Sequence, residues 1–143
     1  MTEPTDPDHQ AWAATAAPTL EDIHALAEAA RAALPAPFAA QAAAVLLRVE
    51  DFADAEMLAD LGMDDAFDLT GLYDGIPLTE ASLMDQRDRP DTIWLFRRPI
   101  LDEWLERESE PLGRLVAHVY VHELAHHFGW SDAEIARIDR WWE

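Results

Sequence analysis

The sequence contains neither cysteine nor lysine, and each absence excludes a class of chemistry. None of the 143 residues is Cys, and all ten basic residues are Arg. Without thiols the chain forms no disulfide, offers no thiolate nucleophile and binds no metal through sulfur. Without a lysine amine, Schiff-base catalysis on a lysine is excluded as well.

Positive charge is scarce throughout. The chain has 29 acidic residues against 10 basic ones, which gives a formal net charge of −19. Nucleic-acid binding needs clustered cations that neutralise phosphates, and anionic membrane surfaces attract basic segments. We therefore expect no nucleic-acid and no membrane partner, and any peptide that the protein binds should be basic rather than acidic.

Long apolar runs are also missing. No run approaches the roughly 20 residues of a membrane span. The first ten residues, MTEPTDPDHQ, have neither the basic nor the apolar region of a signal peptide. These features predict a cytoplasmic protein, and nothing in the sequence indicates its oligomeric state.

The length and composition predict one domain with a tail. Half of the 143 residues are hydrophobic, as in a globular chain with a single core. Residues 1–18 contain three prolines and several acids but no periodic apolar face, so we expect a disordered or weakly ordered acidic tail. The domain would then occupy residues 19–143.

Hydrophobic periodicity and breaker residues predict an α+β domain with few strands. The first helix would begin at an N-cap, Thr19, with Asp22 completing a capping box. Residues 64–80, rich in Gly and Pro, are expected to be an ordered loop. Helices are expected at residues 19–34, 54–61, 99–107, 112–128 and 131–142, and strands at 44–49 and 92–98.

The segment HELAH, residues 122–126, carries the most specific chemistry. On a helix, residues four apart differ by about 40° in azimuth and 6 Å in rise, so the imidazoles of His122 and His126 can converge on one ion. Imidazole favours borderline metals such as zinc. Glu123 lies about 100° round the helix from His122, from where its carboxylate can reach a metal-bound water. The pattern predicts two metal ligands and a general base.

Catalytic zinc usually has three protein ligands, and Asp132 is the candidate for the third. On a straight helix Asp132 would lie about 9 Å above His126. A break at Gly129, which tolerates positive φ, would bring it back towards the ion. Alternatively, Asp132 only interacts favourably with the dipole of the helix that Ser131 caps, and Glu134 or a second water is the third metal ligand. Iron(II) shares a preference for two histidines and one carboxylate.

The motifs together resemble a known family. HELAHHFGWSD is similar to the HExxHxxGxxD form of the zincin motif, and GLYDGIPLTE and PDTIWLFRRPIL precede it. Together they resemble the small bacterial zincin-like metallopeptidases over about residues 65–135, roughly half of the chain. The resemblance implies a minimal zincin-like α+β fold, with a small mixed sheet packed on an active-site helix and Zn2+ between them.

The same resemblance assigns roles to individual residues. His122, His126 and Asp132 match the metal ligands, and Glu123 matches the catalytic glutamate. It also implies that a substrate peptide pairs with an exposed strand edge, for which Thr92–Arg98 is the candidate. The methionine turn of the larger metzincins is absent from the sequence.

The primary prediction is a zinc-dependent peptidase, a hydrolase with a metal-activated water and a glutamate base. One alternative is a zincin-like metal-binding module with a regulatory or binding role, and another is a helical domain with an accidental motif. For the remaining polar residues near the motif we expect packing or local pairing rather than catalysis. These residues are Tyr73, Arg97, His118, Tyr120 and His127.

Overall fold

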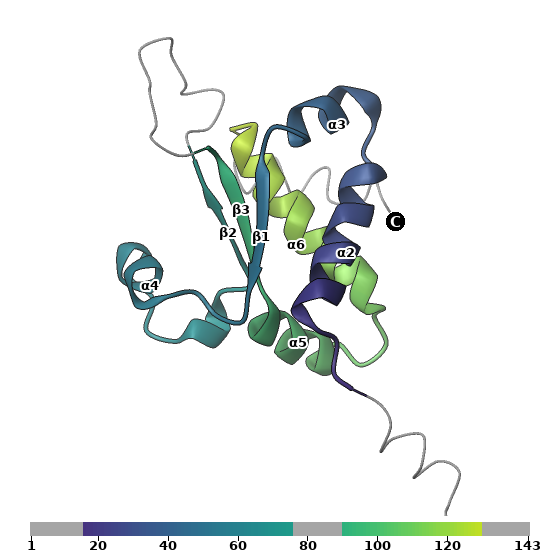
Figure 1. The fold of residues 1–143 in the computed structure, drawn as a ribbon. Coiled ribbons are helices and arrows are strands. Elements are labelled where there is room, and N and C mark those ends of the chain that lie inside the picture. The colour runs from purple at the N-terminus through teal and green to yellow at the C-terminus, as the bar shows by residue number, and fades with distance from the viewer. Residues whose placement is uncertain (1–15, 76–89, 130–143) are drawn as a thin grey trace, which may run out of the picture.

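A computed structural model describes residues 16–75 and 90–129 of the chain. Within these residues a three-stranded sheet is surrounded by helices (Figure 1). The elements are α2 (Leu20–Ala32), α3 (Ala36–Ala42), β1 (Leu46–Glu50), α4 (Ala55–Leu61), the 3-10 turn η1 (Ala66–Asp68), β2 (Gly71–Asp74), β3 (Thr92–Phe96), α5 (Arg97–Glu106) and α6 (Leu112–His127).

The sheet is mixed, with the strand order β1-β3-β2. Strand β1 runs parallel to β3, with Leu46 opposite Thr92, and β2 runs antiparallel to β3, with Gly71 opposite Leu95. Strand β3 lies in the centre because its sequence, TIWLF, is apolar on both faces, and four of its five residues are buried. The predicted fold class, a small mixed sheet packed on a helix, is confirmed.

Helices α2 and α6 pack together against one face of the sheet (Figure 1). Alternate residues of β3 point towards these helices, as the two-residue period of a strand requires. The helices contribute their apolar stripes to the same core. Fully buried members of this core are Ile23, Ala27, Ile93, Leu95, Leu115, Val116 and Tyr120.

Local sequence signals account for most helix ends. At α2 the N–H of Thr19 donates to Asp22 Oδ2 at 2.8 Å, and the N–H of Asp22 donates to Thr19 Oγ1 at 3.1 Å, so the predicted capping box is confirmed. Gly62 ends α4 in the left-handed conformation, with φ of 67°. Gly129, just past α6, has φ of 82°, which breaks the helix where the sequence predicts.

Two expectations about the elements were wrong, and one helix was not expected at all. The segment expected to be a loop contains η1 and β2, because pairing with β3 stabilises a four-residue strand that has no clear period of its own. Helix α3 was not predicted; Pro35 serves as its N-cap, and Pro37 lies in its first turn. Finally, the strand that begins at Thr92 ends at Phe96, since α5 already begins at Arg97.

The position of β3 also corrects the predicted substrate strand. The segment Thr92–Arg98 is expected to be an exposed edge, but β3 has hydrogen-bonded neighbours on both sides. Among the described residues, β1 and β2 each have a neighbour on only one side. None of the helices in this part of the chain is both long and apolar enough to cross a membrane. Most of the expected tail, the expected last helix and Asp132 lie outside the described residues.

Candidate metal centre

The candidate site lies on α6, the longest helix in the described part of the chain. Its buried residues recur along one side and fix the helix against β3 and α2. His122, Glu123 and His126 are only partly buried, so their side chains lie where the packed face of the helix gives way to accessible surface. The helix therefore holds these three groups on a rigid element.

The three predicted side chains converge. One potential ligand atom from each of His122, Glu123 and His126 lies within 4.8 Å of the other two. The rings of His122 and His126 have centroids 5.0 Å apart and are nearly perpendicular, at 78°. One helical turn separates the two histidines, so the backbone brings their rings together without help from a distant segment.

This donor set fits a zinc ion. Imidazole nitrogens bind zinc at about 2.0–2.1 Å, so two such ligands around one tetrahedral ion lie roughly 3.4 Å apart. Donor atoms already within 4.8 Å of one another need only small side-chain rotations to reach that spacing. Glu123 belongs to the same group. The donors thus suit a borderline divalent metal with an acid beside it.

Strand β2 passes very close to this part of α6. A Cβ added at Gly71 would lie 2.8 Å from Val119 Cγ1 and 3.2 Å from Glu123 Cγ. Only a glycine permits that approach, because 2.8 Å is shorter than any tolerated carbon–carbon contact. The glycine therefore places the edge strand β2 directly beside Glu123.

A second polar cluster joins the end of α6 to the sheet. The hydroxyl of Tyr73 on β2 donates to Asp91 Oδ2 at 2.8 Å and lies 2.9 Å from His127 Nδ1. His127 Nδ1 is also 3.2 Å from Asp91 Oδ2. Burial lowers the pKa of His127 although Asp91 acts in the opposite direction, so the ring is neutral at pH 7. The three side chains thus form one polar cluster between β2, the start of β3 and the end of α6.

Sequence reasoning missed this cluster. His127 is expected to pack apart from other functional residues, and Asp91 is not predicted to take part at all. The cluster joins residues up to 54 positions apart, so no local spacing reveals it. One signal was available, since Tyr73 and Asp91 lie within the two segments, GLYDG and PDTIW, that the family resemblance already singles out.

Tyr120 packs in the core, as expected. Its side chain is fully buried, and its hydroxyl accepts a hydrogen bond from Arg31 Nε at 3.0 Å. Burial raises the pKa of Tyr120, and the nearby Arg31 opposes that change. Arg31 also donates to the carbonyl of Val45 at 3.1 Å, so one guanidinium joins α2, α6 and the start of β1.

Two other residues considered in the sequence analysis, His118 and Arg97, lie outside the candidate metal group. His118 stacks on His122 with ring centroids 6.5 Å apart, but it is not a member of the candidate metal group in the described chain. Arg97 forms an ion pair with Asp51 at 3.1 Å, so the expected local pairing is confirmed.

A mixed three-stranded sheet on a helix that carries two histidines and a glutamate is the arrangement that the zincin resemblance implies. A family model described as zincin-like metallopeptidase matches residues 42–142, more than half of the chain. The chain therefore belongs to the zincin-like metallopeptidase family. No curated protein matches the sequence.

Proposed function

We propose that the protein is a zinc-dependent peptidase. The observation that carries the proposal is the convergence of His122, Glu123 and His126 beside an edge strand, in a chain of the zincin-like metallopeptidase family. His122 and His126 would hold the zinc ion, with Asp132 as the proposed third ligand. Bound zinc would supply Lewis acidity, which lowers the pKa of a water molecule and polarises a carbonyl.

Glu123 is the proposed general base. Its carboxylate accepts a proton from the attacking water as the new C–O bond forms at the peptide carbonyl carbon. It then passes that proton to the amine nitrogen as the C–N bond breaks, so protons and charge balance over the cycle. The close approach of Gly71 to Glu123 Cγ restricts the side chain on one side and limits its rotamers.

Strand β2 is the proposed support for the substrate. It has one hydrogen-bonded neighbour among the described residues, β3, and it lies against the helix that carries the site. A peptide that adds to the other side of β2 would gain backbone hydrogen bonds and lie beside Glu123. The proposed partner is therefore a peptide or protein, and the excess of acid in the sequence favours basic substrates.

The test separates metal binding from turnover. Glu123→Gln should retain stoichiometric zinc in elemental analysis while hydrolysis of a peptide library falls by about 10²–10⁴-fold, the usual contribution of a general base. His126→Ala should lose the zinc. Glu106→Gln is the matched control, because it makes the same change on the exposed side of α5 and should alter neither reading.

Two outcomes would refute parts of the proposal. Unchanged hydrolysis in Glu123→Gln would remove the role of general base. Stoichiometric zinc with no turnover of any peptide, even in the wild type, would instead favour a metal-binding module with a regulatory role. Comparing the zinc affinities of Asp132→Asn and Glu134→Gln identifies the third ligand, since only loss of a true ligand should weaken binding markedly.

A further inference from the structure

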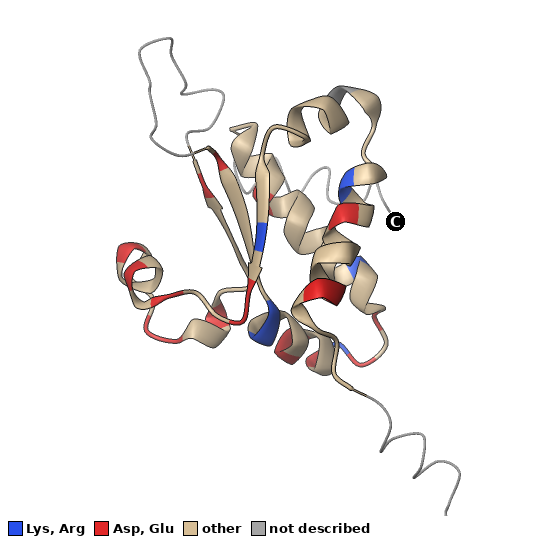
Figure 2. Ribbon diagram, viewed as in Figure 1, with Lys and Arg blue, Asp and Glu red and all other residues tan. Residues whose placement is uncertain are grey.

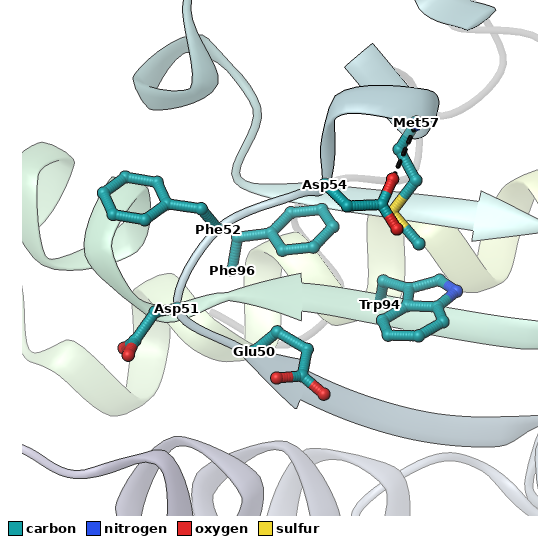
Figure 3. Close-up of a pocket in the computed structure, with 7 residues that line it drawn as sticks. All are labelled: Glu50, Asp51, Phe52, Asp54, Met57, Trp94 and Phe96. Carbon is teal, nitrogen blue, oxygen red and sulfur yellow. Dashed lines mark hydrogen bonds between the residues drawn. The ribbon is translucent and has the colours of Figure 1, made fainter. Parts of the chain in front are cut away.

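A pocket of about 340 Å³ lies on the side of the sheet away from the metal centre (Figure 3). Trp94 and Phe96 of β3 line it, and they alternate along the strand with Ile93 and Leu95, which face α6 and the core. Met57 of α4 closes the pocket from the other side. The pocket is therefore separate from the residues assigned to zinc.

The walls of this pocket combine aromatic rings with acids. Besides Phe52, three carboxylates line it, those of Glu50, Asp51 and Asp54. Figure 3 shows the carboxylates of Glu50 and Asp54 on opposite sides of the Trp94 indole. Aromatic faces and carboxylates both attract organic cations, so the pocket matches a guanidinium or ammonium group.

Two of the three carboxylates are available to such a cation. Asp51 already forms an ion pair with Arg97 at 3.1 Å. One oxygen of Asp54 accepts a hydrogen bond from the N–H of Met57 at 2.8 Å, which leaves its negative charge uncompensated. The Glu50 carboxylate is exposed and has no ion-pair partner within residues 16–75 and 90–129.

The same aromatic residues already bind guanidinium groups of the chain itself. Arg48 Cζ lies 5.0 Å from the centroid of the Trp94 ring, and Arg98 Cζ lies 5.5 Å from that of Phe52. Neither arginine is among the residues that line the pocket. These contacts show that the local arrangement suits arginine side chains.

The surroundings extend the negative charge beyond the pocket. Residues 50–68 contain eight acids and no basic residue. Figure 2 shows these acids along α4 and the segments on either side of it. A surface that carries charge of one sign attracts partners of the opposite charge and raises their association rate.

A metal ion is a poorer match than a peptide. In the described chain, the residues whose ligand atoms lie within 4.8 Å of one another are His122, Glu123 and His126, not the pocket acids. The three pocket carboxylates therefore do not converge as closely as the donors on α6. The aromatic rings among the lining residues offer no metal ligand and favour an organic cation instead.

We propose that the pocket between α4 and the sheet, lined by Glu50, Asp54 and Trp94, binds an arginine side chain of a basic segment in a partner or substrate protein. The interaction is a docking contact and does not depend on zinc. Failure of this proposal therefore leaves the proposed peptidase site unaffected, and the reverse also holds.

The test follows the Trp94 indole N–H signal of the full chain by NMR, assigned through Trp94→Phe. A nine-residue peptide with three arginines separated by glycine and serine should shift that signal in a saturable way. The same peptide with citrulline in place of arginine, which keeps the shape but removes the charge, should not.

Two double variants, each of which removes two negative charges, serve as the test and its control. Glu50→Gln with Asp54→Asn should raise the dissociation constant about tenfold, since it removes two partly exposed charge contacts. Asparagine caps a helix as well as aspartate does, so α4 should stay intact. Glu56→Gln with Asp60→Asn lies on exposed positions of α4 outside the pocket and should change the constant less than twofold.

Three results would overturn the proposal. One is equal binding of the citrulline peptide. Another is equal weakening by both double variants, which would mean a general field rather than a site. The third is a Trp94 signal that shifts with protein concentration alone, because a second copy of this chain would then occupy the pocket.

Discussion

Two glycine-to-alanine substitutions, at Gly71 and Gly113, should change stability in opposite directions. Both add one methyl group to a residue whose backbone φ is not positive, so neither is strained by conformation alone. They differ in what the methyl group meets. At Gly113 the nearest atom is Leu26 Cδ2 at 3.4 Å, an ordinary contact, whereas at Gly71 it is Val119 Cγ1 at 2.8 Å.

The magnitudes follow from packing and chain entropy. Gly113→Ala lies in the first turn of α6 and should stabilise the fold by about 0.5–1 kcal/mol, because alanine favours the helix and restricts the unfolded chain. Gly71→Ala gains a similar amount from the unfolded chain but costs about 1–3 kcal/mol in overpacking against Val119 and Glu123. Its net effect should be a loss of roughly 0.5–2 kcal/mol.

Urea unfolding followed by circular dichroism measures both variants. The unfolding midpoint should rise for Gly113→Ala and fall for Gly71→Ala, with the m-value unchanged in each. Because the added methyl group also displaces Glu123, peptide hydrolysis by Gly71→Ala should fall further than its stability loss explains. If the midpoint of Gly71→Ala did not fall, the close approach of β2 to α6 would be wrong.

Three other perturbations have expected outcomes. Tyr73→Phe removes a hydroxyl that bonds His127 and should lower the free energy of unfolding by about 1–2 kcal/mol, measured in urea. Arg31→Met leaves the hydroxyl of Tyr120 and the carbonyl of Val45 without their donor, so a loss of about 2–3 kcal/mol is expected by the same method, and an unchanged midpoint would contradict it. Zinc at 100 times its dissociation constant should stabilise the fold by about 2.7 kcal/mol, so excess chelator should lower the melting temperature measured by calorimetry.

The convergence of His122, Glu123 and His126 was predictable because it depends on one helix. Apolar residues recur at helical spacing through residues 115–125, which indicates a helix, and the i, i+4 spacing then sets where the rings lie. The break after the helix was predictable for the same reason, since Gly129 is the residue that accepts positive φ. Neither inference needs a partner from elsewhere in the chain.

Strand β2 was not predictable from its own residues. Four residues with a glycine at the start carry little strand preference, and the strand exists because β3 supplies its hydrogen bonds. The sequence places β3 correctly but says nothing of which strands lie on its two sides. Its assignment as the exposed edge therefore failed, although its first residue and its apolar character were clear.

Gly71 makes β2 difficult to predict from the sequence pattern, but the close approach of β2 to Glu123 also requires a glycine at this position. A larger residue at Gly71 would have made the strand easier to recognise, but it would have collided with Val119 and pushed β2 away from Glu123. Local preference and global packing therefore conflict at this position, as is common near functional sites. A weak strand signal beside a strong helix motif is itself a reason to look for an edge strand that approaches the helix closely.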